Sequence, residues 1–136
     1  MTGPETKILV IDDMVAMRMR VMNQLKAMGF TKIEQAGDGK EAYELIVRRR
    51  SEENPFDLVI SDWNMPVMTG IELLEKIRSD KDLKAMPFVM VTAEGEKLQV
   101  VRALKAGVTD YLIKPVNKED LEKKLAALSF SAKAAA

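Results

Sequence analysis

Five polar side chains that suit phosphate and metal chemistry each stand within two residues after a short apolar run. Asp12 and Asp13 follow ILVI (8–11), Asp62 follows LVI (58–60), Thr92 follows FVMV (88–91) and Lys114 follows YLI (111–113). Carboxylates are hard oxygen ligands that suit Mg²⁺, which commonly completes its coordination shell with water and phosphate oxygens. A lysine ammonium group binds phosphate as a point charge, and a threonine hydroxyl can donate to a phosphate oxygen. These residue types indicate a site for a phosphoryl group and a divalent cation.

The residue types that are missing narrow the choice of nucleophile. The chain contains no Cys and no His. Thiol and imidazole chemistry, disulfides and the usual zinc ligands are therefore excluded. A carboxylate is then the best nucleophile, and its reaction with a phosphoryl group gives an aspartyl phosphate. Because three neighbouring acids repel one another, we expect the pKa of at least one carboxyl group to be raised without metal.

Each of these residues also has a simpler interpretation. Asp13 and Thr92 could cap the helices that follow them, Asp62 could be a surface acid, and Lys114 with Pro115 could form a turn. None of these interpretations predicts that all of the residues lie at the same end of one sheet. The joint pattern therefore favours a functional site.

The elements that position these side chains alternate between strands and helices. The apolar runs predict strands at 8–11, 33–36, 58–60, 88–91 and 111–113, and helical periodicity predicts helices at 14–28, 39–50, 70–79, 95–106 and 118–128. Nearly continuous apolar runs are typical of parallel strands covered on both faces. The alternation predicts an α/β fold with a doubly wound, five-stranded parallel sheet and five helices. In such sheets, ligands bind at the carboxyl ends of the strands.

The apolar residues in these helices predict which faces pack on the sheet. The expected core positions of the first helix are Met14, Met17, Val21, Leu25 and Met28, with Gly29 ending the helix. In the fourth helix they are Leu98, Val101 and Leu104, and in the last helix Leu121, Leu125 and Leu128.

Length and charge set the broad class of protein. The 136 residues predict a single domain, with a core at about 7–128 and a short Ala-rich tail at 129–136. Lys and Arg number 21, and Asp and Glu also number 21. This balance gives no reason to expect nucleic acid or a membrane surface as a partner. No apolar stretch reaches the length of a signal peptide or a membrane span, so we expect a cytoplasmic protein.

Several motifs resemble the receiver domains of two-component response regulators, and the chemotaxis members of that family most closely. They are "AGDGKEA", "DWNMPVMTG", "VTAEG" and "GVTDYLIKP", and the resemblance extends from Lys7 to Leu128. It implies the flavodoxin-like strand order 2-1-3-4-5, for which this family is a standard example. It also implies that Asp62 accepts a phosphoryl group from a phosphohistidine on a sensor histidine kinase.

The resemblance assigns a role to each residue of the site. Asp12, Asp13, Asp62 and the backbone carbonyl of Asn64 would hold Mg²⁺. Lys114, Thr92 and the Ala93 N–H would contact the phosphoryl oxygens, while Asn64 and Glu94 would control dephosphorylation. Thr92 and Tyr111 would form the switch that follows phosphorylation, and the Lys114–Pro115 bond is expected to be cis.

The function implied by the resemblance is a stand-alone signalling switch, not an enzyme, although it catalyses its own phosphorylation and dephosphorylation. The implied partners are a chemotaxis-type histidine kinase, a flagellar motor switch protein or another output target, and a phosphatase, with the chain acting as a monomer. Two alternatives keep the same site: a phosphorelay receiver and a receiver module of a larger regulator. A Mg²⁺-dependent phosphohydrolase with Asp62 as nucleophile is a further alternative, but such enzymes commonly carry a second acid where this chain has Asn64.

Overall fold

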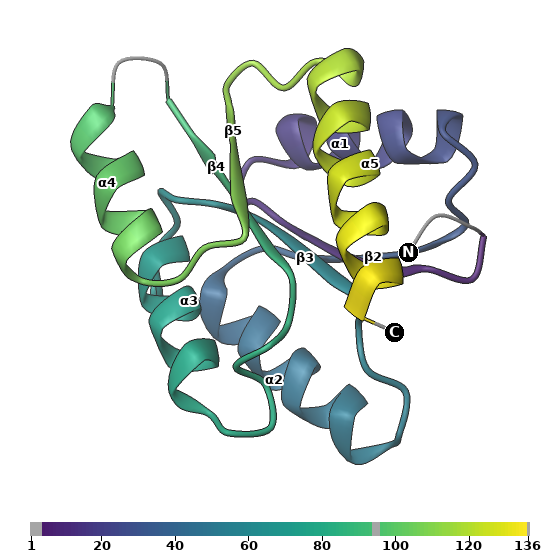
Figure 1. The fold of residues 1–136 in the computed structure, drawn as a ribbon. Coiled ribbons are helices and arrows are strands. Elements are labelled where there is room, and N and C mark those ends of the chain that lie inside the picture. Colours follow the sequence, from purple (N-terminus) through teal and green to yellow (C-terminus); the bar gives the residue numbers. More distant parts are fainter. Residues whose placement is uncertain (1–3, 94–95, 136) are drawn as a thin grey trace.

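The protein is a five-stranded parallel sheet between two layers of helices (Figure 1). The structure is a computed structural model that describes residues 4–93 and 96–135, with side chains as far as Leu128. The strands are β1 (Lys7–Ile11), β2 (Lys32–Ala36), β3 (Leu58–Asp62), β4 (Phe88–Thr92) and β5 (Asp110–Ile113). The helices are α1 (Val15–Ala27), α2 (Gly39–Ser51), α3 (Gly70–Ser79), α4 (Lys97–Lys105) and α5 (Lys118–Ala135). No helix in the described ranges is both long and apolar enough to cross a membrane.

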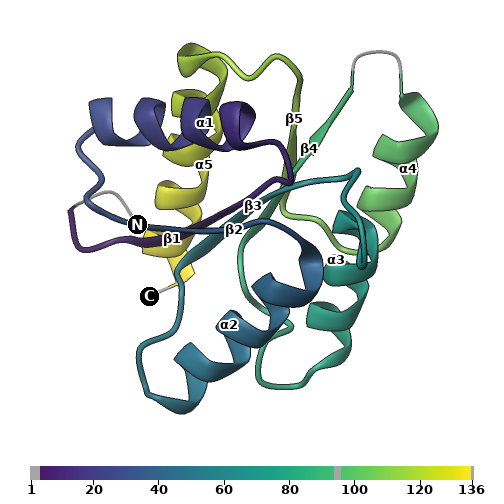
Figure 2. The ribbon, with the colours of Figure 1, turned by 180° about the vertical axis from the view of Figure 1, so that it is seen from behind.

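The strand order β2-β1-β3-β4-β5 confirms the predicted doubly wound sheet. All residues of β3 and β4 are buried, as expected for central strands with a helix layer on each face. One core cluster lies between the sheet and helices α2, α3 and α4, and a second lies between the sheet and helices α1 and α5. Figure 2 shows α1 and α5 together on one side of the sheet, with α2 and α3 on the other.

Local sequence signals explain how two of the helices begin. The Asp38 side chain accepts a hydrogen bond of 2.8 Å from the Glu41 N–H and caps α2. Thr69 and Glu72 form a reciprocal capping box at the start of α3. The predicted bounds of α3 are confirmed, whereas α5 continues beyond the predicted end at Leu128.

The predicted core face of α1 is only partly correct. Val21 and Leu25 are buried, but Met14 is 56% exposed and Met17 is half-buried, while Met22 is buried in their place. The sequence spacing did not show that the first turn of α1 extends past the end of the sheet, beside the acidic residues. Met14, just before the helix, therefore faces solvent.

The predicted core face of α4 is wrong. Leu98, Val101 and Leu104 are 85%, 47% and 56% exposed, whereas Ala103 is completely buried. The helix carries a second, smaller apolar stripe that includes Ala103 and Ala106, and this stripe packs against the core. Small side chains allow a helix to approach its neighbours closely, so the larger side chains are left outside. The predicted start of this helix, at residue 95, lies outside the described residues.

The connection between β3 and α3 contains a backbone conformation that is unfavourable for its residue. Val67 has φ 69°, and the Met68 N–H donates a 2.7 Å hydrogen bond to the Pro66 carbonyl. A positive φ is rare for a β-branched residue because its side chain meets the backbone. The side chain is 76% exposed, so packing does not compensate for this strain.

We predict that Val67→Asn stabilises the protein, because Asn adopts positive φ more readily than Val. The expected gain in unfolding free energy is on the order of 1 kcal/mol, measured by urea denaturation. A matched change at the exposed but helical Val101, Val101→Asn, should give no such gain. A loss of stability in Val67→Asn would show that the turn is not strained.

Candidate phosphoacceptor and metal site

The register of the sheet places the predicted site residues in one row. Ile11 pairs with Ser61, so the next residues, Asp12 and Asp62, are neighbours. Asp62 pairs with Val91, and Thr92 pairs with Ile113, so Thr92 and Lys114 lie one step further along their strands. Short strands that end at nearly the same level thus bring side chains from the ends of four strands together at the carboxyl edge of the sheet.

Three carboxylates form the acidic part of this row. Oxygen atoms of Asp12, Asp13 and Asp62 all lie within 4.8 Å of one another. Asp12 and Asp62 are 6% and 3% exposed, whereas Asp13 is exposed. One Asp12 oxygen accepts a 2.9 Å hydrogen bond from the Met14 N–H, and one Asp62 oxygen accepts a bond of the same length from the Trp63 N–H. The remaining oxygens form a cluster suited to a divalent cation.

Lys114 places a positive charge against these acids. The Lys114 Nζ is 3.0 Å from an Asp62 oxygen and 3.8 Å from an Asp12 oxygen. The Lys114 N–H also donates to the Thr92 carbonyl at 2.8 Å, which fixes the lysine backbone to β4. The Lys114–Pro115 bond is cis, as predicted.

Burial is the main reason that two of the carboxyl groups are harder to ionise. It raises the pKa of Asp62 above its ordinary value of 3.8, although the hydrogen bond and charge of Lys114 act in the opposite direction. Burial also raises the pKa of Asp12, and repulsion from Asp62 and Asp13 adds to this effect. The expected direction is confirmed, but repulsion between the acids is the smaller cause.

Thr92 supplies a buried hydroxyl without a hydrogen-bond partner. Its Oγ1 is buried and contacts no donor or acceptor within hydrogen-bond distance among the described residues. Buried polar groups are nearly always paired, so an unpaired one calls for an explanation. A phosphoryl oxygen on Asp62 would provide the acceptor. The orphan hydroxyl and the acidic cluster together fit a site for phosphate and Mg²⁺.

The capping interpretations of Asp13 and Thr92 are not supported. The residue preceding α1 is Met14, and the one preceding α4 is Glu96; neither makes a side-chain capping hydrogen bond within the described part of the chain. The two polar side chains are thus not needed to begin these helices.

Gly70 contributes to the site, although the motifs gave no reason to select it beyond starting a helix. Its N–H donates a 2.9 Å hydrogen bond to the Trp63 carbonyl. A Cβ at this position would collide with the Asp62 carbonyl oxygen and lie 2.9 Å from the Met90 sulfur. Glycine therefore allows α3 to start directly against the backbone that carries Asp62.

Arg18 was also missed by the sequence analysis. Its guanidinium donates to the Asp12 carbonyl and, at 2.7 Å, to the Gln35 side chain. These bonds connect α1 with the ends of β1 and β2. Only the three-dimensional contacts reveal this role, because an arginine in the first turns of a helix has no distinctive sequence signal.

The remaining predicted residues lie around this centre. Asn64 and Ala93 are exposed, which leaves them accessible to solvent and ligands. Glu94, predicted to influence dephosphorylation, lies outside the described residues. Tyr111 is half-buried, with the Lys124 Nζ 5.1 Å from the centre of its ring.

A hollow of about 330 Å³ separates α4 from β5 next to Thr92. Its lining is mostly apolar and consists of Thr92, Ala93, Glu96, Lys97, Val100, Val101, Tyr111 and Ile113. The orphan hydroxyl of Thr92 and the ring of Tyr111 thus border the same space.

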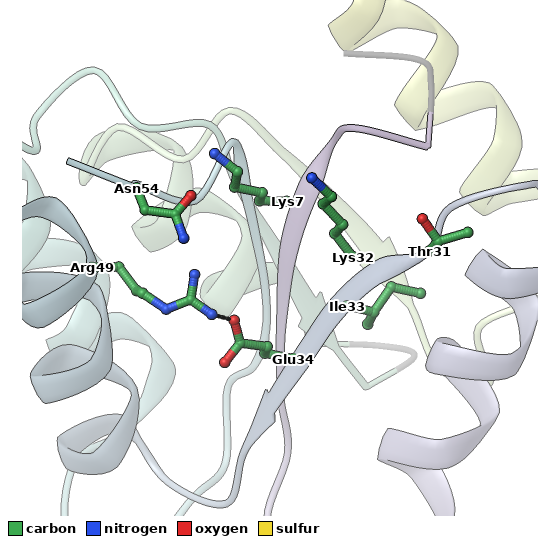
Figure 3. Close-up of a pocket in the computed structure, with 7 residues that line it drawn as sticks. All are labelled: Lys7, Thr31, Lys32, Ile33, Glu34, Arg49 and Asn54. Carbon is green, nitrogen blue, oxygen red and sulfur yellow. Dashed lines mark ion pairs between the residues drawn. The ribbon is translucent and has the colours of Figure 1, made fainter. Parts of the chain in front are cut away.

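A second groove, also of about 330 Å³, lies at the opposite end of the sheet (Figure 3). Its lining residues are Lys7, Thr31, Lys32, Ile33, Glu34, Arg49 and Asn54. Arg49 pairs with Glu34, and the Lys32 Nζ lies 2.9 Å from a Glu5 oxygen. Charged side chains of this kind commonly protect an edge strand from pairing with other chains. This groove is therefore explained by the position of β2 at the sheet edge.

The fold and the acidic edge are those of a signalling receiver domain. The chain belongs to the response regulator receiver domain family, whose model matches residues 8–126. It is 42% identical over 119 residues to the chemotaxis protein CheY-3 of Vibrio cholerae, covering 88% of both chains. It is 41% identical to the chemotaxis protein CheY of Pseudomonas aeruginosa, covering 88% of this chain and 92% of that one.

Solved structures of receiver domains share this fold. CheY4 of Vibrio cholerae has 35% sequence identity and a TM-score of 0.76, over 90% of this chain and 97% of that one. A receiver domain protein of Clostridium thermocellum has 27% identity and a TM-score of 0.82, over 96% and 99% of the two chains. Receiver domains bind Mg²⁺ at an acidic pocket, and the group of Asp12, Asp13 and Asp62 corresponds to such a pocket.

We predict that Asp62→Asn stabilises the metal-free protein at pH 7. The folded protein binds the Asp62 proton more tightly than the unfolded chain, so ionisation opposes folding as pH rises above 3.8. Removing the charge should add on the order of 1 kcal/mol, or roughly 3 to 6 °C in melting temperature. The advantage should shrink as pH falls to 3.8 and below.

Thermal melts in EDTA across this pH range measure the effect. Asp13→Asn is the matched control, because this exposed carboxylate should contribute less. If Asp62→Asn is less stable than the parent at pH 7, the ion pair with Lys114 outweighs the cost of burial and our interpretation is wrong.

Proposed function

We propose that the protein is a response regulator that accepts a phosphoryl group on Asp62 from a sensor histidine kinase. The observation that supports this proposal most strongly is the buried Thr92 hydroxyl, which has no partner in the described part of the chain, at the end of the strand next to the one that ends in Asp62. An acid with Lys114 at 3.0 Å and a free hydroxyl donor nearby has the groups that a phosphoryl acceptor needs. The family membership and the chemotaxis relatives support the same role.

The proposed reaction uses the side chains in this row. A carboxylate oxygen of Asp62 attacks the phosphorus of the phosphohistidine, the phosphorus–nitrogen bond breaks, and the imidazole leaves with the bond electrons and takes up a proton. The Lys114 ammonium group would balance charge on the phosphoryl oxygens, and the Thr92 hydroxyl and Ala93 N–H would donate hydrogen bonds to them. Hydrolysis of the acyl phosphate by water returns Asp62 to its starting state.

Asp12, Asp13, Asp62 and the Asn64 carbonyl would hold Mg²⁺. The cation supplies positive charge that offsets repulsion between the acids and the incoming phosphoryl oxygens. The acidic cluster and the raised pKa of Asp12 and Asp62 support this assignment, because such a site gains from a bound cation. Asn64 and Glu94 are proposed to regulate the access of water to the acyl phosphate.

Incubation with acetyl phosphate and Mg²⁺, followed by intact-mass measurement, tests the proposed function. We expect one labile phosphate adduct in the parent and none in Asp62→Asn. Asp57→Asn is a control acid at the opposite end of β3. Rapid hydrolysis of unrelated phosphoesters without an adduct would instead support the phosphohydrolase alternative.

We predict that Mg²⁺ quenches or enhances the emission of Trp63, the only tryptophan. Its backbone N–H donates to an Asp62 oxygen at 2.9 Å, and the centre of its ring is 6.0 Å from the Arg102 guanidinium carbon. A change at the carboxylates should therefore alter its surroundings. A fluorescence titration should saturate by millimolar Mg²⁺ in the parent. The response should be weaker in Asp13→Asn. A flat titration in the parent would contradict the metal site.

We further propose that phosphorylation is transmitted through Thr92 and Tyr111. The phosphoryl group would draw the Thr92 hydroxyl toward it, and Tyr111 would then turn into the hollow beneath α4. The existing hollow beside both residues supports this step, since the rearrangement needs only a bias between two packings. The affected face would comprise α4, β5 and α5.

The output partner proposed for this face is a flagellar motor switch protein, by analogy with the chemotaxis relatives. The kinase would be of the chemotaxis type, a phosphatase would assist signal decay, and the protein would act as a cytoplasmic monomer. A phosphorelay receiver would use the same chemistry but transfer the group to a second histidine protein.

We predict that Thr92→Ala retains phosphorylation on Asp62 but no longer moves Tyr111. The NMR ring resonances of Tyr111 should shift on phosphorylation in the parent and remain unchanged in the variant. Binding to the motor switch protein should lose its dependence on phosphate. Thr109→Ala, two residues before Tyr111 and next to the start of β5, serves as the control. A parent-like shift of Tyr111 in Thr92→Ala would disprove the coupling.

A further inference from the structure

Two side chains of α1 donate hydrogen bonds to one carbonyl oxygen in a distant part of the sequence. Arg20 Nε and Gln24 Nε2 lie 2.8 Å and 2.9 Å from the Val116 carbonyl oxygen, across sequence separations of 96 and 92 residues. The two donors are four residues apart on a helix, so they lie on the same face. In both views α1 passes beside the start of α5, where this connection lies (Figures 1 and 2).

The carbonyl that they hold belongs to the loop that carries Lys114. Val116 follows Lys114 by two residues, and its side chain is 1% exposed within the core cluster shared with Val21 and Leu25 of α1. On the other side, the Lys114 N–H is bonded to the Thr92 carbonyl at 2.8 Å. The loop is thus fixed to β4 before Pro115 and to α1 after it.

The same helix is also attached to the acidic side of the site. α1 starts three residues after Asp12, and its Arg18 donates to the Asp12 carbonyl. One rigid element therefore spans from the carboxylates to the lysine loop. A change in its contacts to Val116 would alter the position of the Lys114 ammonium group relative to Asp62, now 3.0 Å away.

The stability of the fold alone does not explain why position 24 carries a glutamine. Its Oε1 is buried and has no hydrogen-bond partner among the residues that the structure describes. Leaving a buried acceptor unpaired is unfavourable, and an apolar side chain at this position would avoid that cost. The amide hydrogen bond to Val116 is the contact that an apolar residue could not provide.

We propose that Arg20 and Gln24 are positioning residues that hold the Lys114 loop in place for phosphoryl transfer to Asp62, an inference that rests on the proposed function. Phosphoryl transfer depends on electrostatic groups held at fixed positions. Either donor can hold the carbonyl when the other is lost. Their effects are therefore expected to be non-additive.

The test compares Arg20→Met, Gln24→Leu and the double variant with the parent. Asn23→Leu and Lys26→Met are matched controls, since both residues are exposed on the same helix. The rate of Asp62 phosphorylation by acetyl phosphate at saturating Mg²⁺ should fall roughly 5- to 20-fold in the double variant. Each single variant should lose less than half of that effect on a logarithmic scale, and the controls should match the parent.

Three further measurements separate positioning from a general structural effect. Gln24→Leu should melt at or above the parent temperature, because it removes the unpaired acceptor. The Mg²⁺ affinity reported by Trp63 should remain within about twofold in every variant, because the carboxylates are unchanged. In a Lys114→Met background, the double substitution should cause no further loss of rate, since its effect acts through that lysine.

Several outcomes would overturn the inference. One is a parent-like rate in the double variant. Another is a loss of rate on double substitution in the Lys114→Met background that equals the loss in the parent background. A third is a fall in the melting temperature of Gln24→Leu that accounts for its loss of rate. If the parent itself forms no adduct on Asp62, the proposed function fails before any variant is compared, and the inference fails with it. If the parent is phosphorylated and the double variant behaves like it, only the positioning role is lost.

Discussion

The ion pair between half-buried Lys114 and buried Asp62 is the interaction on which the arrangement of the site depends. Asp62 is 3% exposed, and a buried carboxylate without a cation would be strongly unfavourable. Lys114, at 3.0 Å, compensates only in part, because the pKa of Asp62 remains raised. The site therefore retains a need for further positive charge, which suits a metal ion. A lysine that lies close to the acid but only partly offsets its charge would suit the role proposed for Asp62, which is to accept a phosphoryl group and later release it.

The central sheet was predictable because its physical signal is strong. Continuous apolar runs such as ILVI and FVMV can be buried on both faces only in the middle of a layered fold. Strand positions, helix order and the parallel architecture are therefore confirmed, and the strand order agrees with the family resemblance. The outward face of α4 was not predictable in the same way. That helix has two apolar stripes, and tertiary packing selected Ala103 over the larger Leu98 and Leu104.

The candidate site also has a part that could be predicted from the sequence and a part that could not. Asp12, Asp62, Thr92 and Lys114 could be selected from the sequence because each stands at the end of an apolar strand. Asp62 and Thr92 are the last residues of their strands, and Asp12 and Lys114 directly follow theirs. Parallel strands end at one edge of the sheet. The supporting contacts could not be selected. Arg20 and Gln24 reach a carbonyl more than 90 residues away, and backbone acceptors leave no mark in the sequence. The raised carboxyl pKa values were expected from repulsion, but burial, which only the packed structure reveals, is the larger cause.

The most direct measurement of this account is the ionisation of Asp62 itself. The side-chain carboxyl carbon can be followed by NMR through a pH titration of the metal-free protein, with Asp62→Asn used to assign the signal. We expect a midpoint above the ordinary value of 3.8, a still higher midpoint in Lys114→Met, and a lower one when Mg²⁺ is added. A midpoint at or below 3.8 in the metal-free parent would contradict the claim that burial leaves this carboxylate incompletely compensated.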